Sequence, residues 1–117
     1  MSTTLALMKL KEDQRKIKES LKDLETQKKE IDDKYFTVLN EENKLHKELR
    51  ECRDTYQYSQ LEIRINSITK RRREVESQKQ ELERKVRGYQ EELEKINARI
   101  EYMKPKGELV SKKLDQD

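Results

Sequence analysis

The chain has 117 residues, a length that accommodates one domain at most. Charged residues make up 45% of it and hydrophobic residues only 31%, which excludes a compact globular core and leaves either disorder or a long helix covered by solvent. The net charge of +3 comes from interspersed basic and acidic residues, so the surface is that of a solvated helix rather than of a polycation.

The first predicted element is a helix over about residues 4–53, with Thr3 or Thr4 as its capping residue. Its seam residues recur at spacings that alternate between three and four, the a and d positions of a coiled coil. Apolar residues fill every seam position except Gln14, Lys28 and Glu42. The seam comprises Leu7, Leu10, Gln14, Ile17, Leu21, Leu24, Lys28, Ile31, Tyr35, Val38, Glu42, Leu45, Leu49 and Cys52.

Residues 53–59 separate this seam from a second one whose phase is offset by two residues. Coiled coils absorb insertions of three or four residues by local changes in winding, so an offset of two favours a loop at this point. The pattern Ser59-x-x-Glu62 matches a capping box, with Tyr58 and Ile63 placed as a hydrophobic staple. We therefore expect the chain to reverse at residues 53–59 and the second helix to start at about residue 60.

The second predicted helix covers about residues 60–103 and ends before Pro105, which cannot continue a helix. Only Arg72 and Lys79 interrupt its apolar seam. The seam comprises Tyr58, Leu61, Ile65, Ile68, Arg72, Val75, Lys79, Leu82, Val86, Tyr89, Leu93, Ile96, Ile100 and Met103. Residues 105–117 are expected to be a flexible tail or a short docking segment.

The two seams match when the helices run antiparallel. Pairing residues whose numbers add to 110 sets every a position opposite a d position, for example Leu21 opposite Tyr89. The same register allows Glu42 and Arg72, in neighbouring layers, to form an ion pair. We predict an all-α fold, an antiparallel two-helix coiled-coil hairpin over residues 1–104. One continuous long helix in a parallel coiled coil is the alternative, because residues 53–59 contain neither Gly nor Pro.

No residue pattern indicates catalysis. The single histidine, His46, and the single cysteine, Cys52, do not share a helix face, and no metal-ligand spacing, Gly-rich loop or nucleophile motif occurs. We expect no enzyme activity, no metal and no cofactor. Cys52 fits a small seam residue rather than a redox-active one. A lone cysteine also favours an intracellular, reducing setting, with the cytoplasm preferred to the nucleus. The sequence contains no recognisable signal peptide or membrane span.

Three sets of residues are candidate interaction surfaces. Apolar residues lie outside the seam at mid-arm and at the open end of the hairpin: Leu5, Met8, Phe36, Leu39 and Tyr102. An edge that carries facing carboxylates is a candidate landing site for a basic helix: Glu25, Asp32, Glu76 and Glu83. A basic run is either a nuclear or nucleic-acid contact or, as we favour, a set of side chains on different faces of one helix: Lys70, Arg71, Arg72 and Arg73.

These features favour a non-enzymatic structural or assembly protein, a rigid arm or stalk that contacts protein partners through helices, with a homodimer as a further arrangement. By architecture the predicted hairpin resembles the stalk proteins of flagellar and type III secretion export, the FliJ and YscO type, which implies association with an export ATPase. A nuclear protein associated with nucleic acid is a third reading. A prefoldin-type chaperone is disfavoured, because no strand-forming hub separates the two seams.

Overall fold

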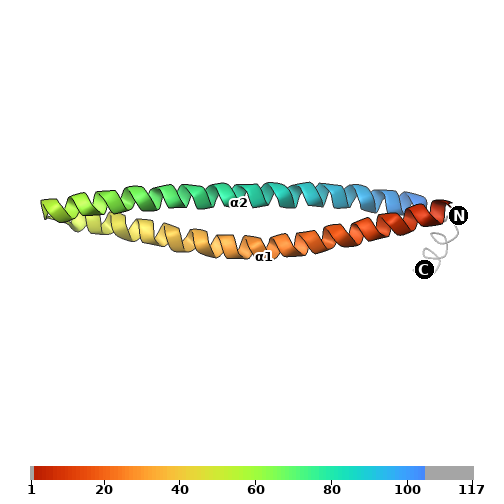
Figure 1. The fold of residues 1–117 in the computed structure, drawn as a ribbon, viewed down its shortest axis with the longest axis horizontal. Coiled ribbons are helices and arrows are strands. Elements are labelled where there is room, and N and C mark those ends of the chain that lie inside the picture. Colours follow the sequence, from red (N-terminus) through yellow and green to blue (C-terminus); the bar gives the residue numbers. More distant parts are fainter. Residues whose placement is uncertain (1, 105–117) are drawn as a thin grey trace, which may run out of the picture. The chain divides into compact units, whose positions relative to one another are not determined.

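The computed structural model of the chain describes residues 2–104, and these form two helices, α1 (Ser2–Glu51) and α2 (Thr55–Met103). Figure 1 shows the two helices, and the expected tail, residues 105–117, lies outside the described residues. The described residues contain no strand, and the chain reverses between the helices, so the antiparallel hairpin is confirmed and the continuous-helix alternative is wrong. α1 begins at Ser2, so Thr3 and Thr4 lie inside the helix instead of capping it.

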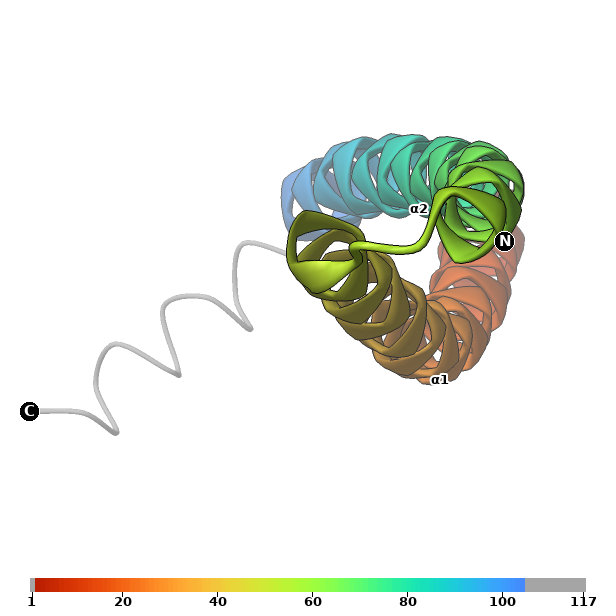
Figure 2. The same cartoon turned by 90° about the vertical axis from the view of Figure 1, so that its left-hand side faces the viewer.

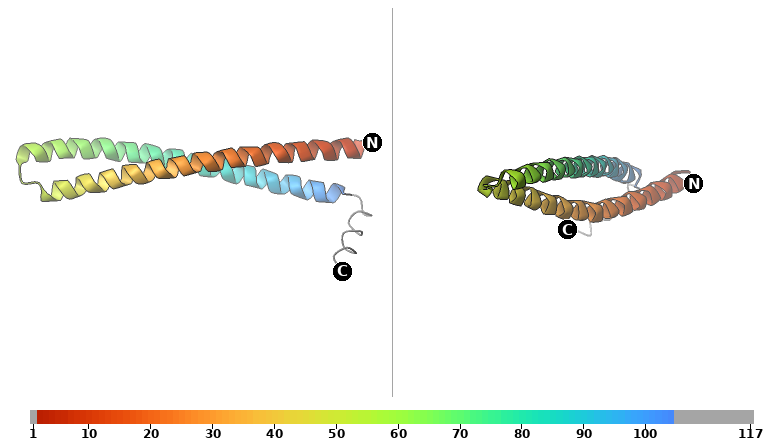
Figure 3. Two further views of the ribbon diagram at one scale, coloured as in Figure 1. Left: turned by 90° about the horizontal axis from the view of Figure 1, so that it is seen from below. Right: turned by 60° about the vertical axis from the view of Figure 1, so that its left-hand side comes forward.

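The reversal takes only three residues, 52–54, which Figure 2 shows end-on and Figure 3 from the side. The last turn of α1 tightens, because the Cys52 N–H bonds to the Leu49 carbonyl at 3.3 Å. Asp54 then caps α2: its Oδ1 accepts from the Tyr56 N–H at 3.2 Å, and its carbonyl accepts from the Tyr58 N–H at 2.9 Å.

This cap corrects the expected tip. α2 starts at Thr55 instead of about residue 60, and the sequence Ser59-x-x-Glu62 lies inside the helix rather than capping it. Asp54 provides an N-cap five residues earlier, and nothing between residues 55 and 59 breaks a helix. No residue among 2–104 has a positive φ, which explains how the chain turns here without glycine.

The described helices fall into two packed units. The terminal unit combines α1 up to Asp23 with α2 from Val86, and the tip unit comprises Leu24–Lys85. The core of the terminal unit is formed by Ile17, Ile96 and Ile100, with Leu7, Leu10, Leu21, Tyr89 and Leu93 packed against them. The main core of the tip unit is formed by Val38, Leu45, Ile65 and Ile68, with Leu49 and Leu61 packed against them.

Burial follows the predicted seams closely. All ten buried residues among those described are seam residues, nine apolar ones and Glu42. All the other seam residues are half-buried except Tyr58, which is 42% exposed. The heptad pattern therefore identified the buried face of both helices.

Candidate interaction surfaces

Polar side chains replace apolar ones in the middle of the tip unit, and they bond across the seam. Arg72 donates from Nε to both carboxylate oxygens of Glu42 at 2.9 Å. The same guanidinium donates from Nη1 to Oε1 of Glu76 at 3.1 Å, one turn along its own helix. The expected pair between Glu42 and Arg72 is thus present.

The Glu42 carboxylate is held ionised in this position although its residue is only 7% exposed. Burial alone would raise the pKa of Glu42, but hydrogen bonds from Arg72 and Thr69 and the Arg72 charge outweigh it and lower that pKa. The hydrogen bond to Glu42 raises the pKa of Arg72 in turn. The two charges therefore stabilise each other within the seam.

Tyr35 and Lys79 extend the network toward Asp32. The Tyr35 hydroxyl donates to Glu76 Oε1 at 2.9 Å, and this hydrogen bond, with burial, raises the pKa of the phenol. The Lys79 ammonium lies 5.1 Å from the centroid of the Tyr35 ring, a cation–π contact. It also lies 3.3 Å from Asp32 Oδ1, an ion pair without hydrogen-bond alignment, so that buried oxygen lacks a hydrogen-bond partner.

These contacts follow one positional rule. When Leu7 of α1 and Tyr58 of α2 are counted as a positions, a polar residue at an a position contacts the residue one place beyond its layer partner on the other helix, so the two residue numbers add to 111. The rule holds for Gln14 with Asn97 at 2.7 Å in the terminal unit, and for Tyr35 with Glu76 and Lys79 with Asp32 in the tip unit. By this rule Arg72 would face the apolar Leu39, which cannot accept a hydrogen bond, and its guanidinium bonds to Glu42 and Glu76 instead.

The acidic edge (Glu25, Asp32, Glu76 and Glu83) is partly paired within the chain. Two of its four members, Asp32 and Glu76, contact cationic seam residues of the same chain. Glu25 is exposed and Glu83 half-buried, and the positional rule sets Glu83 opposite Lys28. Asp32 and Glu76 thus neutralise the cationic seam residues Lys79 and Arg72, a relationship that the edge residues alone do not reveal.

The apolar candidates differ in exposure. Phe36 is 64% exposed, whereas Leu39, three residues further on the same flank of α1, is half-buried. At the other end of α1, Leu5 and Met8 are exposed, as is Tyr102 of α2 at 90%. The heptad frame sets Met8 at a b position and Tyr102 at a c position, so these two lie on opposite flanks of the seam, while Leu5, at an f position, lies on the outer face of α1.

The basic run divides among several faces. Arg72 is half-buried and occupied by Glu42 and Glu76, whereas Lys70, Arg71 and Arg73 are exposed. Lys70 and Arg71 line a shallow groove that also contains Glu74. The run therefore does not form one continuous basic stripe of the kind that tracks a nucleic-acid backbone.

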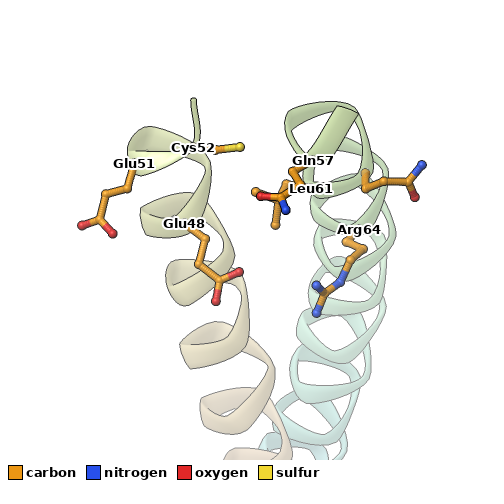
Figure 4. A pocket seen from close by; sticks show the side chains of 7 residues that line it. Glu48, Glu51, Cys52, Gln57, Leu61 and Arg64 are labelled. Carbon is orange, nitrogen blue, oxygen red and sulfur yellow. The ribbon is translucent and has the colours of Figure 1, made fainter. Parts of the chain in front are cut away.

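A groove at the tip contains Cys52. Figure 4 shows its sulfur directed toward α2, near Gln57 and Leu61, while Glu48 and Arg64 extend toward the space between the helices. Cys52 is half-buried, and its thiol lies 3.3 Å from the Asp54 carbonyl oxygen. These contacts are those of a packed seam residue beside the turn.

The described residues carry neither a metal-binding cluster nor a membrane-spanning segment. Among residues 2–104 no group of three or more His, Cys, Asp or Glu side chains is arranged to hold a metal ion. Neither described helix contains a segment long and apolar enough to cross a membrane.

The fold and its surfaces define the chain as an antiparallel coiled-coil hairpin with a polar network in its seam. Comparison with family models, curated proteins and solved structures yields no match to this chain.

One feature of the tip unit has no counterpart among the sequence-derived candidates. A groove is lined by Gln27, Glu30, Ile31, Lys34, Gln78, Glu81, Leu82 and Lys85. The signal that could have found it is a similarity between residues 24–34 and 75–85, which heptad counting does not detect.

Proposed function

We propose that the chain is a non-enzymatic assembly protein, a coiled-coil arm that contacts protein partners through helical surfaces. The observation that carries the proposal is the exposure of Phe36 beside Leu39 on one flank of the tip unit. A plain two-helix coiled coil has polar residues on its flanks, so a large exposed aromatic side chain there favours a contact surface. A partner helix can bury such a residue as an anchor.

The chemistry of this flank suits a helical partner with apolar residues and few charges. Asp32 and Glu76, the carboxylates nearest Phe36 along the edge, are already paired with Lys79 and Arg72. A strongly basic partner would have to compete with these contacts, whereas an apolar one would need only to cover Phe36 and Leu39.

Site-specific photo-crosslinking from position 36 in cells tests the proposal. A photoreactive residue in place of Phe36 should form adducts with a discrete protein partner, and the same residue in place of Asn40, an exposed f position, should not. Equal labelling from both positions, or adducts with nucleic acid alone, would overturn it.

A narrower form of the proposal is an export stalk of the flagellar and type III secretion kind. The support is the two-helix hairpin itself, which is an analogy of fold and not of residues. Binding of the purified chain to an export ATPase would support this form, and the absence of binding would leave only the general proposal.

The nucleic-acid reading is the weaker alternative, because Arg72 is engaged within the seam. Binding that falls steeply with salt and is lost when Lys70, Arg71 and Arg73 are neutralised would favour it. We also propose an intracellular and preferably cytoplasmic setting, supported by the lone reduced Cys52.

A further inference from the structure

Two stretches of the tip unit repeat each other. Residues 24–34 read LETQKKEIDDK and residues 75–85 read VESQKQELERK. Five of the eleven positions are identical, and four more keep the character of the side chain, as Ile31 and Leu82 do. The identical pairs are Glu25 and Glu76, Gln27 and Gln78, Lys28 and Lys79, Glu30 and Glu81, and Lys34 and Lys85.

The repeat has a structural consequence, because the two stretches lie on antiparallel helices of one packed unit. Two similar segments that pack antiparallel are related by a local two-fold axis, here between residues 29 and 30 of α1 and between 80 and 81 of α2. The axis carries the ion pair of Lys79 with Asp32 onto the positions of Lys28 and Glu83, which it therefore sets opposite each other.

The groove between Ile31 of α1 and Leu82 of α2 is centred on this axis. Its eight lining residues form four equivalent pairs: Gln27 and Gln78, Glu30 and Glu81, Ile31 and Leu82, and Lys34 and Lys85. The groove has a volume of about 370 Å³. Since a cavity of roughly 150 Å³ holds a benzene-sized group, it can accept apolar side chains of a partner.

The composition of the groove combines an apolar floor with a neutral rim. Ile31 and Leu82 are seam residues that remain half-buried, so one hairpin alone does not cover them. The rim holds two carboxylates and two ammonium groups beside two glutamines, and each glutamate lies one turn from a lysine of its own helix. A groove with one sign of charge would select an oppositely charged partner, whereas this one is balanced.

We propose that this groove is a self-association surface whose occupant is a second copy of the chain. An isologous interface uses the same patch on both subunits, so the patch must complement itself: a residue that contacts another is contacted in return. When Glu30 of one copy lies beside Lys34 of the other, symmetry also places Lys34 of the first copy beside Glu30 of the second. The half-buried floors of the two grooves then cover each other. This deepens the proposed function by naming one partner and the surface that binds it.

Sedimentation equilibrium with charge-reversed grooves tests the proposal on the full chain. The wild type should form a dimer. An all-basic variant, Glu30→Lys with Glu81→Lys, and an all-acidic variant, Lys34→Glu with Lys85→Glu, should each dimerise at least about tenfold more weakly because like charges then meet. An equimolar mixture of the two variants should form a heterodimer. Circular dichroism confirms that each variant keeps its helices.

The matched control reverses charge away from the groove, with Asp33→Lys and Glu91→Lys at exposed f positions, and should dimerise like the wild type. A wild type that stays monomeric, or groove variants that match the control, would overturn the proposal, as would a mixture that fails to associate. Photo-crosslinking from position 36 reports separately on other protein partners, so a failed dimer and a failed assembly function are distinguishable.

Discussion

Arg72 of α2 bonds through Nε to both carboxylate oxygens of Glu42 of α1, and this pair lies within a seam that is otherwise mostly apolar. A buried pair of this kind contributes less to stability than apolar residues of the same size, but it disfavours registers in which either charge meets an apolar residue. The pair therefore fixes which turn of α1 faces which turn of α2 within the tip unit.

Removing one partner of the Glu42–Arg72 pair should lower the free energy of unfolding, whereas replacing both partners with apolar residues should not. We expect Glu42→Ala to lower the free energy of unfolding by roughly 1–3 kcal/mol, since it leaves a half-buried guanidinium unpaired. The double variant Glu42→Leu with Arg72→Leu should be at least as stable as the wild type. Urea unfolding followed by circular dichroism measures both, with Glu41→Ala as the exposed control; a double variant less stable than Glu42→Ala would refute the explanation.

Acid should weaken the same pair. The pKa of Glu42 is lowered in the folded chain, so its stabilising contribution is complete above the ordinary value near 4.5 and is lost as the pH falls through the lowered folded value. The free energy of unfolding should accordingly drop below about pH 4.5 in the wild type, and less so in the Glu42→Leu, Arg72→Leu variant. An identical acid profile for the two proteins would show that Glu42 does not contribute.

The positional rule and the internal repeat both set Lys28 opposite Glu83. Charge inversion tests this: Lys28→Glu should destabilise the tip unit, because a carboxylate then faces Glu83, and adding Glu83→Lys should restore most of the loss. Thermal unfolding of the two single variants and the double variant gives the coupling between the positions. Additive effects would mean that the two side chains do not interact.

The N-cap of α2 offers a test of the corrected tip. Asp54→Ala should cost about 1 kcal/mol, since it removes the acceptor for the Tyr56 N–H, whereas Ser59→Ala should be nearly neutral. If α2 instead began at about residue 60, the order of the two effects would be reversed. Urea unfolding distinguishes these outcomes.

Sequence reasoning succeeded where one physical pattern decides the outcome and failed where several compete. The alternation of apolar residues identified the buried face, down to the pairing of Glu42 with Arg72, because seam positions are set by helix geometry. It misplaced the start of α2, because Ser59-x-x-Glu62 matches a capping box locally while Asp54 supplies a cap earlier along the chain. It also treated Asp32 and Glu76 as unpaired carboxylates, because assigning Arg72 and Lys79 to the seam did not take into account that their long side chains extend out of it to the flank.

The two seams pair antiparallel in a register where the numbers of facing residues add to 110. Thiol crosslinking tests this register. Cysteines introduced by Leu21→Cys and Tyr89→Cys, in a Cys52→Ser background, are crosslinked with a short bifunctional thiol reagent. We expect rapid crosslinking within one chain, seen in the monomer band at low protein concentration. The reaction should be much slower when the second cysteine replaces Ile96, one heptad away. Crosslinks formed only between chains, or faster reaction at position 96, would contradict it.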